Sequence, residues 1–135
     1  SFVRIGGGIM MSLKKQLIKN YIKMQLLSNM PGELHIRMAN LSNLSKDYVE
    51  FAPYVYDAIK LLNGINDIQV NFTTGEVVIL YSQVLRPEQI IRWINIIIDT
   101  AIDYMDFIAA KWESDRQQVI QTLNQTLINK LQKVY

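Results

Sequence analysis

The sequence predicts an α+β fold, in which a strand–helix–strand–strand–helix core lies between two longer amphipathic helices. Three observations lead to this fold class. Apolar and polar residues alternate in two short stretches, apolar residues recur at helical spacing around them, and Pro or Gly marks most of the junctions. Because half of the 135 residues are apolar, the chain can build one domain with a hydrophobic core.

The N-terminal helix is predicted over residues 10–29. Its apolar side chains recur at spacings of three and four, and a row of lysines follows an adjoining face. Pro31 and Gly32 are expected to end this helix, because Pro restricts the residue before it and Gly permits a turn. Residues 1–9, which include a Gly triplet, are interpreted as a tag remnant or processed leader and carry no fold prediction.

The predicted core begins with a strand over residues 33–39, where apolar and polar residues alternate. A helix is predicted over residues 41–63, because its apolar residues share one face and Asn63-Gly64 is a typical helix end. Pro53 places the start of the main part of this helix near that residue.

Two further strands form a predicted hairpin. Residues 67–72 alternate again, residues 73–75 (Thr-Thr-Gly) are a turn sequence, and residues 76–82 form the returning strand. The element order up to this point is β-α-β-β.

A long helix is predicted for the C-terminal third. Pro87 suits the first turn of a helix, where a missing N–H costs nothing, and neither Gly nor Pro occurs from Glu88 to Tyr135. A continuous helix of these 48 residues would span about 72 Å. Its second half has one apolar stripe from Trp112 to Val134, which is expected to pack on the helix of residues 10–29 or on a second copy of the chain.

Residues 89–110 are apolar enough to resemble a transmembrane segment. Arg92, Asp99, Asp103 and Asp106 interrupt them, and each charge at bilayer depth costs about 2.5–3.5 kcal/mol. These charges share one helical stripe, which is typical of a half-buried helix with one face in water. The sequence therefore predicts no membrane span here.

The net charge of +2 conceals an uneven distribution. Residues 1–37 carry six basic residues and one acidic residue (+5), whereas residues 38–135 carry eight basic and eleven acidic residues (−3). The lysines of the N-terminal helix are Lys14, Lys15, Lys19 and Lys23. They form either a solvated face or a contact for an anionic membrane or an acidic partner. They are too few, and too little interleaved with aromatic residues, to indicate nucleic-acid binding.

Three stretches of the sequence resemble the heavy-metal-associated (HMA) domain family, specifically its divergent cysteine-free members. PGELHIRM (31–38) is similar to the family's Pro-Gly-then-strand opening. LLNGINDIQVNFTTGEVVILYS (61–82) matches its pattern of helix end, Gly-Ile, strand, Asn-x-x-Thr-Gly turn and strand ending in Tyr. RPEQIIRWIN (86–95) is similar to the start of its second helix. The resemblance covers roughly half of the chain and implies a ferredoxin-like βαββαβ fold.

The chain departs from this family where the family binds metal. Usual members carry Cys-x-x-Cys after the first strand, whereas residues 39–44 read Ala-Asn-Leu-Ser-Asn-Leu and the chain has no cysteine. No metal ligand of the family can therefore be assigned here, and Cu(I) exchange between thiolates is chemically excluded. The closing strand is not visible either, so the expected ferredoxin-like core is βαββα. Its unpaired sheet edge would favour a homo-oligomer.

Three residues are candidates for a metal site without thiolates: His35, Met30 and Met38. Imidazole and thioether groups can bind soft metals, but His35 is expected on the strand face opposite Leu34 and Ile36, whereas Met38 is expected to face the core. This arrangement favours a surface histidine beside a packed methionine. The acidic stripe of the C-terminal helix cannot build an oxygen cage alone, although a site between two such helices stays open.

Enzyme signatures are absent from the sequence. One histidine without a nucleophile motif, a Gly triplet that follows no strand, and scattered carboxylates do not indicate catalysis. The expected division is residues 1–30 (leader or tag remnant plus amphipathic helix), 31–100 (HMA-like ferredoxin-fold domain) and 101–135 (helical extension).

The predicted function is that of a non-catalytic accessory module of metal homeostasis or metal transport. It would act by protein–protein contact through its helices and without a cofactor. The resemblance implies a metal-transporting ATPase as a partner. The alternative is a structural adaptor anchored to a membrane or compartment surface through its basic N-terminal helix. The expected location is cytoplasmic, and peripheral at the membrane for the adaptor.

Overall fold

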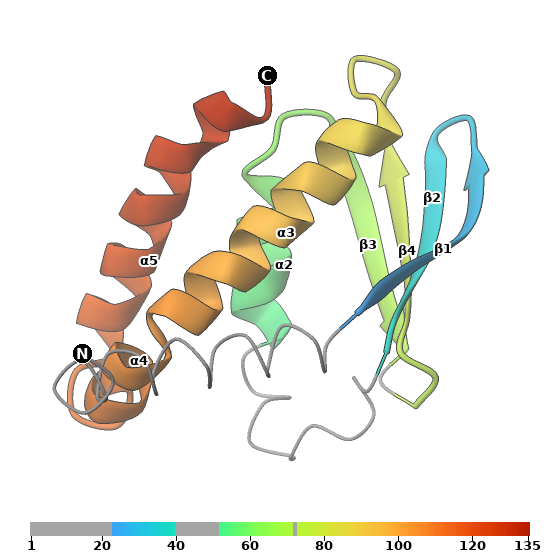
Figure 1. The fold of residues 1–135 in the computed structure, drawn as a ribbon. Helices are drawn as coiled ribbons and strands as arrows, with labels where there is room; N and C mark the ends of the chain where they lie inside the picture. The colour runs from blue at the N-terminus through green and yellow to red at the C-terminus, as the bar shows by residue number, and fades with distance from the viewer. Residues whose placement is uncertain (1–22, 40–51, 72) are drawn as a thin grey trace, which may run out of the picture.

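The computed structural model describes residues 23–39, 52–71 and 73–135. They form an α+β fold of two layers, with a four-stranded antiparallel sheet on one side and helices on the other (Figure 1). The strands are β1 (Met24–Met30), β2 (Glu33–Met38), β3 (Ile65–Asn71) and β4 (Glu76–Tyr81). The helices are α2 (Ala52–Lys60), α3 (Pro87–Asp103), α4 (Met105–Lys111) and α5 (Arg116–Lys130), followed by the 3-10 turn η3 (Leu131–Lys133).

The sheet has the strand order β1-β2-β4-β3, and every neighbouring pair is antiparallel. Because side chains alternate along a strand, Leu34 and Ile36 of β2 share one face with Ile79 and Val77 of β4, and all four are buried under the helices. The predicted strand at residues 33–39 and the predicted hairpin of β3 and β4 are confirmed, with ends that differ by one or two residues.

β1 occupies residues for which the sequence predicted a helix. It forms a hairpin with β2 around Pro31 and Gly32, and Gly32 has a φ of 79°. A type II turn needs this conformation at its third residue and favours Pro at its second. The predicted helix over residues 10–29 is therefore wrong from Met24 onward, and residues 10–22 lie outside the described residues. Pro31-Gly32 turns a hairpin here instead of ending a helix.

β1 also fills the edge of β2 that was expected to be unpaired. The pairing continues beyond the strand ends, because the Ala39 N–H donates a hydrogen bond to the Lys23 carbonyl at 2.7 Å. β2 is therefore paired on both sides, by β1 and by β4, and it is not an unpaired edge of the sheet. The new edge is interrupted by a bulge between Leu26 and Ser28, as is common at sheet edges.

The first described helix, α2, ends three residues earlier than predicted. It covers Ala52 to Lys60 of the described residues, and the predicted residues 41–51 lie outside the described ranges. The chain then enters β3 through Gly64, which has a φ of 109°. A side chain there would meet Leu85 at 2.9 Å, so this position requires glycine for both its backbone and its space.

The predicted continuous helix after Pro87 is wrong. α3 begins at Pro87 as predicted, but it ends at Asp103, and the short helix α4 follows after Tyr104. A new helix then begins at Asp115, whose carboxylate accepts a hydrogen bond from the Gln118 N–H at 3.2 Å. A side-chain oxygen that caps a free N–H is a typical start of a helix, and it needs neither Gly nor Pro.

α5 runs back along α3 in the opposite direction (Figure 1). Thr126 of α5 donates a hydrogen bond to the Tyr104 hydroxyl at 3.3 Å. Closer to the C-terminus, Lys130 donates to the Thr100 hydroxyl at 2.8 Å. The apolar stripe of this segment includes the buried residues Val119, Leu127 and Val134, so its packing partner lies in the same chain. A straight helix would leave this stripe in water, and the fold-back buries it.

The hydrophobic core lies between the sheet and the helical layer, with Trp93 of α3 at its centre. Trp93 is fully buried, and its indole N–H donates a hydrogen bond to the Ala58 carbonyl of α2 at 3.0 Å. This bond crosses from one helix to the other, and Ala58 is itself buried. Trp93 therefore fixes the distance between α2 and α3 above the sheet.

Replacing Trp93 with Phe should lower the free energy of unfolding by about 2–3 kcal/mol. The change removes buried volume and leaves the Ala58 carbonyl without its donor. Urea unfolding followed by the fluorescence of Trp112 measures the effect. Val84→Ala is the matched control, because Val84 is 72% exposed and its loss should change stability by less than about 0.5 kcal/mol. Equal stability of the two variants would contradict the role given to Trp93.

Candidate functional site

The face of the sheet that points away from the helices is the first candidate site, and we name it the open face. In the described part of the chain, all helices lie on the other side of the sheet (Figure 1). Two apolar residues of β4, Val78 and Leu80, lie in its middle and are only partly buried. The strand register places these residues on it: Gln25, Ser28, Met30, Glu33, His35, Arg37, Asp67, Gln69, Asn71, Glu76, Val78 and Leu80.

A charged cluster lies at one end of the open face. Arg37 and Glu76 are directly opposite on β2 and β4, and the Arg37 guanidinium donates a hydrogen bond to Glu76 Oε1 at 3.1 Å. His35 Nε2 lies 3.5 Å from Glu76 Oε2 and makes no hydrogen bond, although the atom is shielded from solvent. Glu33 and Asp67 also lie on the open face. Together with Glu76 they give it three carboxylates against the one guanidinium of Arg37, so the face is acidic.

The register also brings a serine, the histidine and a carboxylate into neighbouring positions. Ser28 is opposite His35, and His35 lies beside Glu76. Activation of a serine requires an imidazole that is held by the carboxylate and accepts the hydroxyl proton. The 3.5 Å contact between His35 and Glu76 is not a hydrogen bond, so it does not hold the imidazole for this chemistry.

The structure separates Met38 from the other two candidate metal ligands, His35 and Met30, which both lie on the open face. His35 lies on the open face as expected, whereas Met38 packs against the core on the other side of β2, so the two cannot bind one ion. Met30 is 59% exposed beside the β1–β2 turn. Within the described ranges, no three His, Asp or Glu side chains are grouped closely enough to hold a metal.

The acidic stripe of the C-terminal segment is divided by the end of α3. Asp99 and Asp103 belong to α3, while Asp106 is exposed on α4. The sequence placed all three on one helical face, and the break at Tyr104 removes the continuous helix on which that face depended.

The lysine row can be placed only at its last member. Lys14, Lys15 and Lys19 lie outside the described residues, and Lys23 is exposed immediately before β1. Lys23 joins the sheet through its backbone and leaves its side chain in solvent. None of the helices in the described ranges is long and apolar enough to cross a membrane.

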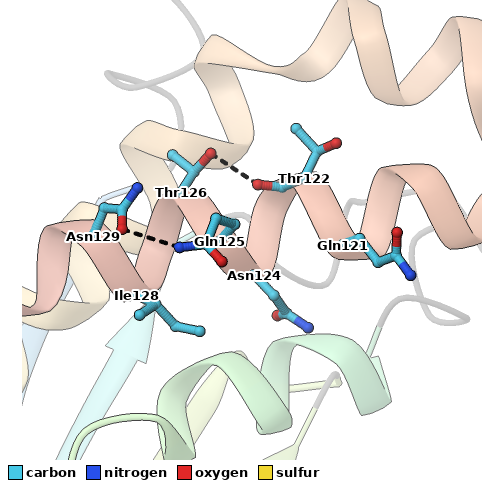
Figure 2. Close-up of a pocket in the computed structure, with 7 residues that line it drawn as sticks. All are labelled: Gln121, Thr122, Asn124, Gln125, Thr126, Ile128 and Asn129. Atoms are coloured by element: carbon cyan, nitrogen blue, oxygen red, sulfur yellow. Dashed lines mark hydrogen bonds between the residues drawn. The ribbon is translucent and has the colours of Figure 1, made fainter.

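The second candidate site is the exposed side of α5, which we name the outer face of α5. It borders a shallow, open hollow of about 700 Å³ (Figure 2). The exposed lining residues, which define the outer face, are Gln121, Asn124, Gln125, Ile128 and Asn129. Thr122 and Thr126 also line the hollow but are half-buried, and Thr126 contacts Tyr104 on the packed side of α5. Ile128 is 46% exposed, and no charged residue occurs at positions 117–129. The run of amide residues is visible in the sequence, but only the packing of α5 shows which side of the helix is free.

Comparisons with protein-family models, with curated proteins and with solved structures found no match to this chain. The open face is acidic with an apolar centre, and the outer face of α5 is polar without charge.

The ion pair of the open face should contribute little to stability. A double-mutant cycle with Arg37→Met and Glu76→Gln should give a coupling energy of about 0.5 kcal/mol, because both side chains are a third or more exposed. The coupling should shrink in about 1 M salt, which screens exposed charges. A coupling above about 2 kcal/mol in urea unfolding would contradict this assignment.

Proposed function

We propose that this chain is a non-catalytic accessory module of metal homeostasis or metal transport that acts by binding another protein. The observation that carries the proposal is the open face, a sheet surface with an apolar centre and a polar border that no described helix covers. Apolar centres with polar rims are the usual anatomy of protein–protein interfaces.

The order of elements supports the resemblance to the HMA family. β2, α2, β3, β4 and α3 follow one another as in a ferredoxin-like βαββα core, and β4 lies between β2 and β3. β1 takes the sheet position beside β2 that a closing strand would take. The fold alone does not define a function. The proposed class of partner therefore rests on the family resemblance, and the proposed mode of action rests on the open face.

The charge of the open face supports a partner with a basic contact surface. Glu33, Asp67 and Glu76 surround Val78 and Leu80, and Arg37 is the one guanidinium among them. A basic partner would be attracted by these carboxylates and would bury the two apolar side chains. The partner that the resemblance implies is a metal-transporting ATPase. The chain would bind this ATPase without passing a metal ion to it through thiolates, because it has no cysteine.

Substitution of Val78 with Arg should weaken partner binding at least tenfold, which corresponds to about 1.4 kcal/mol. The charge would stand in the apolar centre of the open face, and because Val78 is only partly buried and outside the core, the domain should still fold. A photo-crosslinking amino acid at position 69, also on the open face, captures the partner in native host cells, and calorimetry on the purified pair measures the affinity. The expected partner is a metal-transporting ATPase.

Val84→Arg is the matched control, because Val84 is 72% exposed in the loop before α3 and lies outside the open face. Equal affinities of the two variants would remove the open face from the interface, and a captured partner without a role in metal handling would remove the metal assignment. A third outcome is binding to anionic vesicles that disappears when Lys14, Lys15, Lys19 and Lys23 become Glu. That result would favour the membrane adaptor instead.

A further inference from the structure

We propose that the outer face of α5 is a contact between two copies of this chain, which pack with their α5 helices antiparallel. This face belongs to the helical layer, so the contact would leave both open faces free (Figure 1). The proposal does not depend on the metal-related function, because it rests on a different surface.

The first argument is the absence of charge. Residues 117–129 contain no Asp, Glu, Lys or Arg, although 19% of the chain is charged. A two-fold interface places each surface against its own copy, and charges of one sign near the axis would repel one another. The outer face of α5 avoids that repulsion, and an acidic or basic partner would find no opposite charge on it.

The second argument is the chemistry of the amide side chains. Gln and Asn each carry a donor and an acceptor, so a surface rich in amides is complementary to itself. The Gln125 side chain already donates a hydrogen bond to Asn129 Oδ1 at 3.1 Å, one helical turn away. Amides on a second copy can accept and donate in the same way, while the exposed Ile128 supplies an apolar contact.

The third argument is the spacing of the exposed residues. Gln121, Asn124 and Ile128 follow the three-and-four spacing of a helical packing stripe and point to the same side of α5 (Figure 2). Antiparallel packing centred between Asn124 and Gln125 would place Ile128 of each copy over Gln121 of the other. It would also set the helix dipoles in opposite directions, which is favourable.

The size of the face limits the strength of this contact. α5 has 15 residues and is about 22 Å long, so one side of it buries less than a standard interface of about 800 Å² per partner. The dimer is therefore weak, and its fraction rises with protein concentration. Its population is expected to be small in dilute solution and substantial near 1 mM.

Sedimentation equilibrium of the full chain, at concentrations up to about 1 mM, tests the contact. The unchanged chain should show a monomer–dimer equilibrium, and Ile128→Lys should weaken it at least tenfold by placing two like charges near the axis. Val84→Lys is the control. The Val84 side chain is also exposed, but Val84 belongs to the loop before α3 and is not part of α5. Far-ultraviolet circular dichroism of both variants checks that they are folded. A monomer at every concentration would overturn the proposal, as would equal dimerisation of both variants.

The lack of cysteine provides a second test that reports the geometry. Gln125→Cys introduces the one thiol of the chain next to the expected axis, whereas Gln69→Cys places it on the open face. Under mild oxidation, the Gln125→Cys variant should form a disulfide-linked dimer much faster than the Gln69→Cys variant. Equal rates, or faster linkage through position 69, would overturn the α5 contact. Partner binding through the open face would be unaffected by either result.

Discussion

The arrangement of this domain depends on the burial of Trp93 between two helices. Its indole fills the centre of the core, and its N–H satisfies the Ala58 carbonyl, so α3 cannot shift along α2 without losing both packing and a buried hydrogen bond. With α3 fixed, Thr100 and Arg92 lie on the side of α3 that faces the returning segment. Thr100 accepts a hydrogen bond from Lys130, and Arg92 donates one to the Val134 carbonyl. The described helices therefore gather on one side of the sheet and leave the other side open.

The elements that sequence reasoning predicted correctly are those with one unambiguous local signal. The alternation in β2 and β3 admits no helical face, the Thr-Thr-Gly turn at residues 73–75 predicts β4 as the returning strand, and Pro87 suits only a first turn. The errors lie where a local signal has two meanings. Pro31-Gly32 can end a helix or turn a hairpin, and the neighbouring strand β2 decides between them. The absence of Gly and Pro after Pro87 predicts a continuous helix, but it does not exclude a break, because Ser114-Asp115 is a typical N-cap sequence that starts α5.

The candidate sites were less accessible to prediction than the strands. Alternation alone placed His35 on the open face and Met38 in the core, as the structure has them. The ion pair of Arg37 with Glu76 joins residues that are 39 positions apart, so it depends on a register that no local pattern contains. The uncharged run at residues 117–129 is plain in the sequence. Its meaning depends on which side of α5 packs against α3, and that is a property of the tertiary fold.

The edge position of β1 determines how the sheet opens. β1 is joined to β2 by a two-residue turn, and none of its residues is fully buried. Within the described residues, β1 is held mainly by its hydrogen bonds to one neighbour. It is therefore the strand whose detachment costs the least free energy, in the sense of a local opening below global unfolding. Its backbone amides would exchange with solvent first, and each such opening would expose the edge of β2 to another extended chain.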